Sequence, residues 1–450
     1  MTPPEAAAIE SSLPLAPTHH RRVRGRARTL QMLKEVVREA VYGVSRNRLR
    51  AALSMLGISW GIVSVVMLLA YGNGFHDALM VGFRNAFGDG VAVLFSGQTS
   101  MQAGGQRAGR RIRLKPEDVS ALAELPAVKF ASPEYFNRLT MTYGDRTSTF
   151  GLRGVATSYG TMRGERPARG QGRWLTDDDM AERRRVVFLG YEVARKLFGE
   201  QRAVGQTIRI GNRPFEVVGV MEDKVQMSSY FQPDKYCAFI PWTTMGELQD
   251  TTYVSTIVIQ TVNPLQQDKA LRQVREVLGK KYRFEPTDER AINIQDSVEN
   301  IGMISGITNG LKMVLTVVGV LTLAIGGVGI MNIMFVSVTE RTREIGIRKA
   351  LGARRREILL QFLVEAFIIT FLGGAVGVAA SWLMVWVFSP RPFLAELLDD
   401  LSRRTDIHLV LSLELLGICT AILMVVGMIA GFLPAMRASR LDPIEALRYE

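Results

Sequence analysis

The chain has 450 residues, a net charge of +12 and a slightly positive mean hydropathy, which is unusual for a soluble protein. Its basic residues are not gathered with aromatic side chains on one folded domain, which argues against a nucleic-acid-binding protein. No sequence of the form Gly-x-x-x-x-Gly-Lys-Ser/Thr occurs, which excludes ATP hydrolysis by these residues through a phosphate-binding loop.

Cysteine and histidine are too few and too scattered to indicate a disulfide framework or a metal site. Cys237 falls in a long polar segment and Cys419 in an apolar block, so the two are expected in different compartments. The histidines have no metal-binding spacing. They are His19, His20, His76 and His408. We therefore expect this chain to bind no metal and no cofactor itself.

Four apolar blocks are each long enough to cross a membrane as a helix, which takes about 20 residues. They are residues 53–71, 312–338, 358–388 and 409–433. Residues 1–29 form an arginine-rich tail that we predict to be disordered. Because no small-residue cleavage site follows the first block, we interpret that block as a span rather than a signal peptide.

The positions of lysine and arginine predict how these spans are oriented, since both residues are enriched in cytoplasmic flanks. The N-terminal flank, the loop 339–357 and the tail 434–450 are strongly basic, whereas segments 72–311 and 389–408 have nearly balanced charges. We therefore predict an α-helical membrane protein with four transmembrane helices and cytoplasmic termini. Its large mixed α/β extracytoplasmic domain is inserted between helices 1 and 2.

Residues 72–311 alternate short apolar runs with amphipathic stretches, and Gly211-Asn212 has the pattern of a two-residue hairpin turn. Strands are expected at Val186–Gly190, Thr207–Ile210, Arg213–Met221 and Tyr253–Val262, and helices at Lys115–Leu125, at Tyr191–Gly199 and from Asn263 onward. This order predicts an antiparallel or mixed sheet with helices on one side.

No group of residues in this domain has the pattern of a catalytic site. Asp177, Asp178 and Asp179 are adjacent and cannot all point at one centre, so we interpret them as acids in the first turn of a helix rather than as a metal site. The Gly-, Gln- and Arg-rich stretch Gly97–Arg110 is predicted to be a mobile loop; a phosphate cradle would need a strand-to-helix context that is missing. A binding or coupling domain is favoured over an enzyme.

Small residues are frequent in the predicted spans, and several lie four apart, which lets helix backbones approach closely in a membrane. The glycines concerned are Gly326, Gly327, Gly329, Gly373, Gly377, Gly427 and Gly431. Packing within one subunit and a dimer interface both fit this pattern. Glu365 and Glu414 are single carboxylates near span ends, so a structural or interfacial role is favoured over an ion path.

The loop after the second span carries a helical pattern. Glu344 and Arg348 are four residues apart, in the favourable order for an ion pair on a helix. Ile347 and Leu351 add apolar side chains, and Gly352 can end the helix. A helix lying in the membrane interface and a protruding helix that docks into a partner's groove both fit these residues.

This loop, ERTREIGIRKALGARRREIL (Glu340–Leu359), resembles the loop after the second span in the MacB/FtsX family of bacterial ABC-transporter permeases. The tail Asp442–Glu450 is similar to that family's ending. Residues 30–52 resemble its cytoplasmic amphipathic helix, which runs into the first span. The segments GRWLTDDDMAERRRVVFLGYEVARKLFG and VGQTIRIGNRPFEVVGVM resemble its periplasmic core domain. The resemblance covers nearly the whole chain, from about Leu30 to Glu450.

The resemblance implies a non-catalytic permease subunit in the bacterial inner membrane, paired with a second copy or a close paralogue. In that family the ATPase is a separate subunit or is fused to the permease. Because only the arginine-rich tail stands here in the place of a fused nucleotide-binding domain, we expect a separate ABC ATPase. It would bind ATP and Mg²⁺, move the external domain and drive export or efflux by mechanotransmission. A periplasmic adaptor and an outer-membrane channel are further implied partners. The ATPase-coupling residues would be Glu340, Arg341, Arg343, Glu344, Ile345, Ile347, Arg348, Lys349, Leu351 and Gly352.

Other functions share parts of this plan. Within the same family, lipoprotein sorting and the regulation of cell-wall hydrolases use the same four spans. A membrane-anchored sensor with an external binding domain belongs to a different class, but the sequence contains no cytoplasmic signalling domain. A membrane-bound enzyme would need a catalytic cluster. None of these patterns specifies the substrate.

Overall fold

The computed structural model describes residues 48–393, 395 and 405–448. The predicted tail 1–29 lies outside the described residues, and so do residues 30–47 of the predicted amphipathic helix 30–52, whereas residues 48–52 are helical. These two predictions therefore remain predictions.

The described residues form two compact units. A helical unit comprises the described residues up to Leu68, Thr316–Met384 and the residues from Leu411 onward. An α/β unit comprises Leu69–Leu315 and Val385–Val410. We describe each unit by itself.

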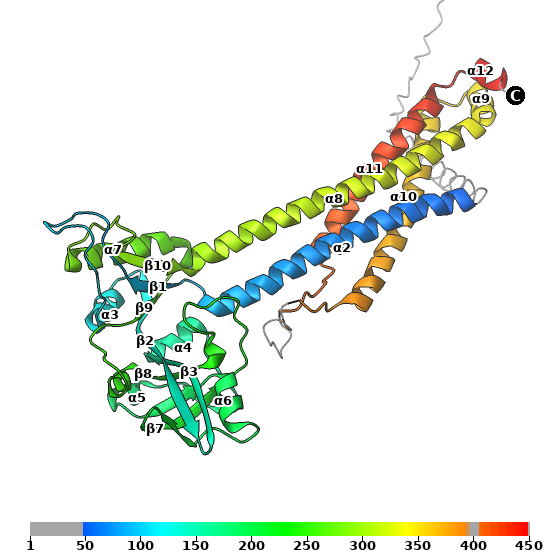
Figure 1. Ribbon diagram of the computed structural model, residues 1–450. Helices are drawn as coiled ribbons and strands as arrows, with labels where there is room; N and C mark the ends of the chain where they lie inside the picture. Colours follow the sequence, from blue (N-terminus) through cyan, green and yellow to red (C-terminus); the bar gives the residue numbers. More distant parts are fainter. Residues whose placement is uncertain (1–47, 394, 396–404, 449–450) are drawn as a thin grey trace, which may run out of the picture. The chain divides into compact units, whose positions relative to one another are not determined.

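Four helices in the described part of the chain are long and apolar enough to cross a membrane. They are α2 (Arg48–Phe87), α8 (Ser297–Glu340), α10 (Arg355–Phe388) and α11 (Leu413–Arg440) (Figure 1). Each corresponds to one predicted apolar block. The last helix begins four residues later than its block because Ser412 caps it, its hydroxyl accepting the Leu415 N–H at 3.1 Å. Two short helices, α9 (Thr342–Ala350) and α12 (Pro443–Arg448), complete the helical unit.

Helices α2 and α8 are much longer than a bilayer requires. They have 40 and 44 residues, or about 60 and 66 Å at a rise of 1.5 Å per residue, whereas the hydrocarbon core is about 30 Å thick. The turns beyond their apolar blocks belong to the α/β unit. Both helices therefore continue without interruption from one unit into the other, which the length of the apolar blocks did not predict.

Six of the seven glycines singled out in the sequence face another helix of the same chain. The helix pairs are α8–α2 at Gly326, α8–α11 at Gly327, α10–α2 at Gly373 and Gly377, and α11–α10 at Gly427 and Gly431. The Ser59 hydroxyl donates a hydrogen bond to the Gly373 carbonyl at 2.7 Å, so this contact is polar as well as close. An added Cβ at Gly329 would meet no atom within 4 Å in the described part of the chain. Packing within one subunit thus accounts for six positions, and a dimer interface at Gly329 stays a prediction.

In the described α/β unit, ten strands form one sheet, in the order β10-β1-β9-β2-β3-β8-β5-β7-β4, with β6 pairing to β2 and β7. The strands are β1 (Val91–Ser96), β2 (Val128–Tyr143), β3 (Arg146–Val155), β4 (Pro167–Gly172), β5 (Val186–Leu189), β6 (Thr207–Ile210), β7 (Arg213–Met221), β8 (Cys237–Pro241), β9 (Thr256–Thr261) and β10 (Ile292–Asp296). The pairs β3–β8 and β5–β7 are parallel and the other pairs are antiparallel, so the sheet is mixed, as predicted.

Helices cover both faces of this sheet, and the prediction of helices on one side is wrong. The helices are α3 (Pro116–Ala123), α4 (Thr157–Arg163), α5 (Asp177–Ala181), α6 (Tyr191–Phe198) and α7 (Gln267–Tyr282), with short 3₁₀ turns at Asp234–Tyr236, Trp242–Glu247 and Pro264–Gln266. One core contains Ile257 of β9 together with residues of α3, α6 and α7. The other contains the next residue, Val258, with Tyr159 and Met162 of α4. Successive side chains of a strand point to opposite faces, so both faces need a cover.

Several local predictions are confirmed. The hairpin of β6 and β7 turns at Gly211-Asn212, with Ile210 paired to Arg213. The three acids from Asp177 to Asp179 lie in the first turn of α5, and Asp179 completes a capping box with Thr176.

The stretch Gly97–Arg110 is irregular, as predicted, but hydrogen bonds hold it to the segment that follows α7. The backbone N–H of Gln98 donates to Arg290 O at 2.9 Å, and the Asp288 carboxylate accepts from Ser100 at 2.6 and 2.7 Å. These contacts fix the start of the stretch to the rest of the domain.

Candidate functional site

The loop helix predicted to couple the chain to a partner is helix α9, and α12 packs against it. Lys349 donates hydrogen bonds from Nζ to the carbonyls of Ser439 (3.0 Å) and Leu441. A Cβ added at Gly346 would lie 2.7 Å from the Ala446 Cβ, so only glycine permits this approach. The C-terminal helix and the loop helix therefore form one structural element.

The ten predicted coupling residues divide into two groups. Arg341, Ile345 and Lys349 face the rest of the helical unit: Ile345 is buried, and Arg341 Nη1 lies 3.2 Å from Glu365 Oε2. The others are exposed or partly exposed, namely Glu340, Arg343, Glu344, Ile347, Arg348, Leu351 and Gly352. Ile345 is buried and cannot meet a partner directly, whereas contact of the other nine with a partner stays a prediction.

The outward group presents an apolar surface next to charged residues. Ile347 is 45% exposed and Leu351 is 84% exposed, so both apolar side chains are available for contact with a partner. The predicted pair is present, with Arg348 Nη2 at 2.8 Å from Glu344 Oε1. Gly352 has a φ of 99° and follows the helix end, a conformation that glycine adopts without strain.

The two intramembrane carboxylates have different surroundings. Glu365 of α10 is buried and paired with Arg341, which fits a structural role and ties the loop to this span. Glu414 is exposed in the first turn of α11, where an acid interacts favourably with the N-terminal end of the helix dipole.

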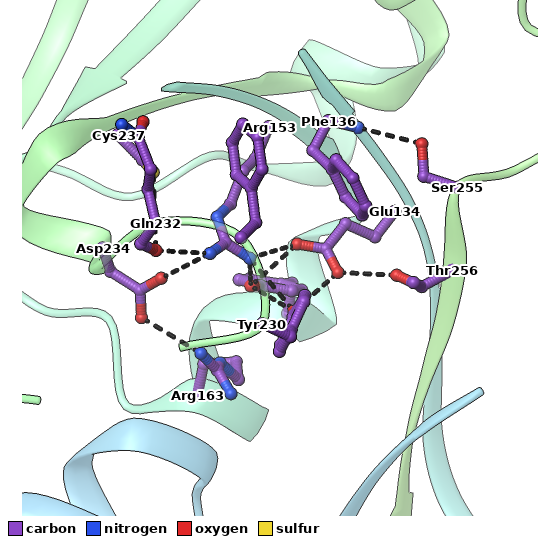
Figure 2. A network of polar contacts seen from close by, with 12 residues as sticks. Glu134, Phe136, Arg153, Arg163, Tyr230, Gln232, Asp234, Cys237, Ser255 and Thr256 are labelled. Carbon is purple, nitrogen blue, oxygen red and sulfur yellow. Dashed lines mark hydrogen bonds and ion pairs between the residues drawn. The ribbon is translucent and has the colours of Figure 1, made fainter. Parts of the chain in front are cut away.

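A buried ion cluster in the α/β unit was not predicted from the sequence. Its charged members are Glu134, Arg153, Arg163, Glu165, Lys224 and Asp234, and the hydroxyls of Tyr159 and Tyr230 complete it. Figure 2 shows Glu134, Arg153, Arg163, Tyr230 and Asp234 of this cluster. The cluster joins β2, β3, α4 and the segment that follows β7. Three cations and three acids lie together away from water, so each charge depends on its partners.

Arg153 lies at the centre of this ion cluster, fully buried (Figure 2). Its Nη1 pairs with Glu134 and donates to the hydroxyls of Tyr159 and Tyr230, each at 3.0 Å. Its Nη2 donates to Gln232 O at 2.8 Å and lies 3.2 Å from Asp234 Oδ1. One guanidinium therefore connects two strands to the segment after β7.

The pKa values of two acids in the cluster shift in opposite directions, although burial raises both. Burial raises the pKa of Asp234, but Arg163, Arg153 and Lys224 outweigh it and hold that pKa well below its usual range. Burial raises the pKa of Glu165 to about 8, although Lys224 lies 2.8 Å away, because Asp234 shares that cation. Burial also raises the pKa of the Cys237 thiol to about 12, so this cysteine is expected to be unreactive.

We expect Glu165→Gln to reduce the pH dependence of stability. The folded protein holds the Glu165 proton up to pH about 8, whereas the unfolded chain loses it near pH 4.5. The native state then binds more protons between these values, so the free energy of unfolding falls as pH rises, by up to about 1.4 kcal/mol per unit. Thermal unfolding of the detergent-solubilised chain at pH 5.5 and 8 measures the slope. The exposed Glu200→Gln is the control, and an unchanged slope in Glu165→Gln would contradict the assignment.

Comparison with known proteins identifies both parts of the chain. The family described as MacB-like periplasmic core domain matches residues 51–277, and the family described as FtsX-like permease C-terminal matches residues 316–443. The chain belongs to the MacB/FtsX permease family. It is therefore a four-span membrane protein with a MacB-like α/β core domain between its first and second spans.

Curated MacB/FtsX relatives include two named "Macrolide export ATP-binding/permease protein MacB". The protein of Bdellovibrio bacteriovorus is 32% identical over 444 residues, which are 98% of this chain and 66% of that protein. The protein of Chlorobium phaeobacteroides is 34% identical over 414 residues, which are 92% of this chain and 60% of that protein. This chain thus spans about three fifths to two thirds of the length of these relatives.

Two solved structures each match about half of this chain. The periplasmic region of MacB from Actinobacillus actinomycetemcomitans is 20% identical, with a TM-score of 0.40, and the match covers 50% of this chain and 98% of that one. The extracellular domain of the noncanonic ABC-type transporter YknZ from Gram-positive bacteria is 19% identical, with a TM-score of 0.38, covering 46% of this chain and 99% of that one.

Proposed function

We propose that this chain is the permease subunit of an ABC transporter, coupling ATP hydrolysis on a separate ATPase subunit to movement of the α/β domain. The observation that carries the proposal is the surface formed by Ile347 and Leu351, whose apolar side chains are exposed beside the Glu344–Arg348 pair. A helix with exposed apolar anchors and charged neighbours is suited to docking in a partner's groove. ATP and Mg²⁺ would bind to that partner.

The long helices offer a physical route for the coupling. Helix α8 ends at Glu340, directly before Arg341 and α9, and its other end lies in the α/β unit. Helix α2 likewise continues from the apolar block into that unit. Movement of α9 would therefore reach the α/β domain along unbroken helices, which supports mechanotransmission rather than passage of a substrate between the spans.

The basic flanks support a bacterial inner-membrane location with cytoplasmic termini and an extracytoplasmic α/β domain. Export or efflux is the activity that the names of the relatives suggest. A homodimer or a pair with a close paralogue, a periplasmic adaptor and an outer-membrane channel complete the proposal.

The test is purification of the chain from its native membrane in a mild detergent. We expect an ABC ATPase to co-purify and the isolated complex to hydrolyse ATP. If no ATP-binding protein accompanies the chain, and the preparation shows no ATP hydrolysis above that of a mock purification, the proposed function is wrong.

A further inference from the structure

A cavity of about 340 Å³ lies in the α/β unit, next to the buried ion cluster. It is bounded by the last turns of α2 with the glycine that follows it (Val81–Gly88), by the end of α4 with the residues that follow it (Thr161–Arg166), and by the segment from Met221 to Val225. Ligand pockets commonly measure about 300–1,000 Å³. The cavity is therefore large enough for a small polar molecule.

Arg163 lines this cavity and also belongs to the ion cluster, where Figure 2 shows it paired with Asp234. The residue is only 2% exposed, and its Nη2 lies 3.3 Å from Asp234 Oδ2. In the described part of the chain, its Nε and Nη1 have no hydrogen-bond partner. The ring of Tyr230 lies 5.4 Å from the guanidinium carbon, and contact with a ring leaves in-plane N–H donors unused. A buried donor without an acceptor is unfavourable, so these two nitrogens are available to an acceptor on a ligand.

Two further arginines line the same cavity. Arg84 comes from α2 and Arg166 follows α4, and both side chains are exposed. Neither guanidinium forms a hydrogen bond or an ion pair with a residue that the structure describes. Lys224 also lines the cavity, although its ammonium group is already held by Arg163 O (2.5 Å) and Glu165 Oε1 (2.8 Å). The arginines thus supply forked donors that match the oxygens of a phosphate.

Carboxylates share the lining with these cations. Glu222 and Asp223 both contact the cavity. A purely anionic ligand would meet repulsion there, whereas hydroxyl or amine groups could donate to these oxygens. The lining therefore matches a molecule that combines an anionic group with hydrogen-bond donors.

We propose that this cavity binds the phosphate group of a small polar molecule that also carries hydroxyl or amine groups. Arg84 and Arg166 hold the phosphate oxygens, Arg163 forms the inner wall, and the carboxylates of Glu222 and Asp223 accept from the donors. Such a ligand joins the end of α2 to the segment that follows β7. A phospholipid headgroup and a free phosphorylated compound share this chemistry.

The test measures ligand binding to the full-length chain in a non-ionic detergent, at constant ionic strength. Glycerol 3-phosphate represents the free compounds, and dihexanoyl phosphatidylglycerol, used below its micelle concentration, represents the lipids. We expect saturable binding, which Arg84→Gln combined with Arg166→Gln weakens at least tenfold. Arg209→Gln changes an exposed arginine that does not line the cavity, and should leave binding unchanged. Equal binding of both probes indicates headgroup recognition, and binding of the lipid alone indicates a lipid ligand.

The proposal is overturned if neither probe binds saturably, or if the double variant binds as tightly as the unmodified chain. Because both arginines are exposed and make no ion pair with the described residues, the unfolding temperature without ligand should not change. Each single variant gives a second measurement, with an intermediate loss of affinity expected. Equal losses in Arg209→Gln and the double variant would show general charge attraction and would also overturn the proposal.

Discussion

Arg153→Met is expected to destabilise the α/β domain by about 3–5 kcal/mol, because it removes one partner of a buried ion pair and leaves the other charged. Glu134 and Asp234 both lie against this guanidinium and both are fully buried. Methionine fills part of the space but supplies no charge and no hydrogen-bond donor. The unfolding temperature of the detergent-solubilised chain should fall by about 10 °C.

Matched variants separate loss of charge pairing from a general effect of substitution. Arg138→Met changes an exposed arginine on β2, and should shift stability by no more than about 0.5 kcal/mol. Adding Glu134→Gln to Arg153→Met removes one of the two carboxylates that lose the guanidinium. The double variant should therefore recover at least about 1 kcal/mol of the free energy of unfolding relative to the single variant. If Arg153→Met unfolds at the same temperature as Arg138→Met, the cluster does not hold this domain together.

The ion cluster could not be predicted from the sequence. Glu134 and Arg153 are 19 residues apart, and Tyr230 is 96 residues from Glu134, so no local spacing relates them. A charged residue in a strand is ordinarily placed on the solvent side. Glu134 and Arg153 become interior only because β2 pairs with β3 and β9 and because the segment after β7 packs over them. Cooperation among distant residues has no sequence signal of its own.

The hairpin of β2 and β3 was also not predicted from the sequence, but for a different reason. A two-residue turn, Gly144-Asp145, separates two strands of 16 and 10 residues, and Gly-Asp is a recognised hairpin signal. The strand before it contains Pro133 and several polar residues, which interrupt the apolar alternation. Turn chemistry was therefore visible in the sequence, whereas the flanking periodicity was too weak to identify the strands.

The membrane spans could be predicted because their physics is local. Each span depends on the hydropathy of about 20 consecutive residues, and the structure places a long helix over every predicted block. The lengths of α2 and α8 were not predictable in this way, since their polar turns are held by contacts within the α/β unit. The Met227 N–H, for example, donates to Gly82 O at 3.2 Å.

The loop helix α9 was predictable from the sequence in part. The sequence correctly indicated a helix with a Glu344–Arg348 pair, because that pair depends on residues four apart. It did not show that Lys349 binds the carbonyls of Ser439 and Leu441, since those residues lie about 90 positions away. Lys349 therefore helps to position α9, and its contact with a partner stays a prediction. Charge reversal at Lys349 would disturb the fold of α9 against α12 as well as any docking.

Ile347→Asp combined with Leu351→Asp is therefore the sharper test of coupling. Both side chains are exposed, so the variant should insert and fold normally, with a stability change of about 0.5 kcal/mol or less. Burying each residue in a partner's groove would contribute about 1.5–3 kcal/mol, so losing both should weaken binding of the ATPase subunit at least about 100-fold. Quantitative co-purification and ATP turnover of the complex measure the effect. Leu265→Asp, at an equally exposed leucine in the α/β unit, is the matched control and should leave both unchanged. Normal ATPase recovery with the double variant would show that the outward face of α9 is not the docking surface.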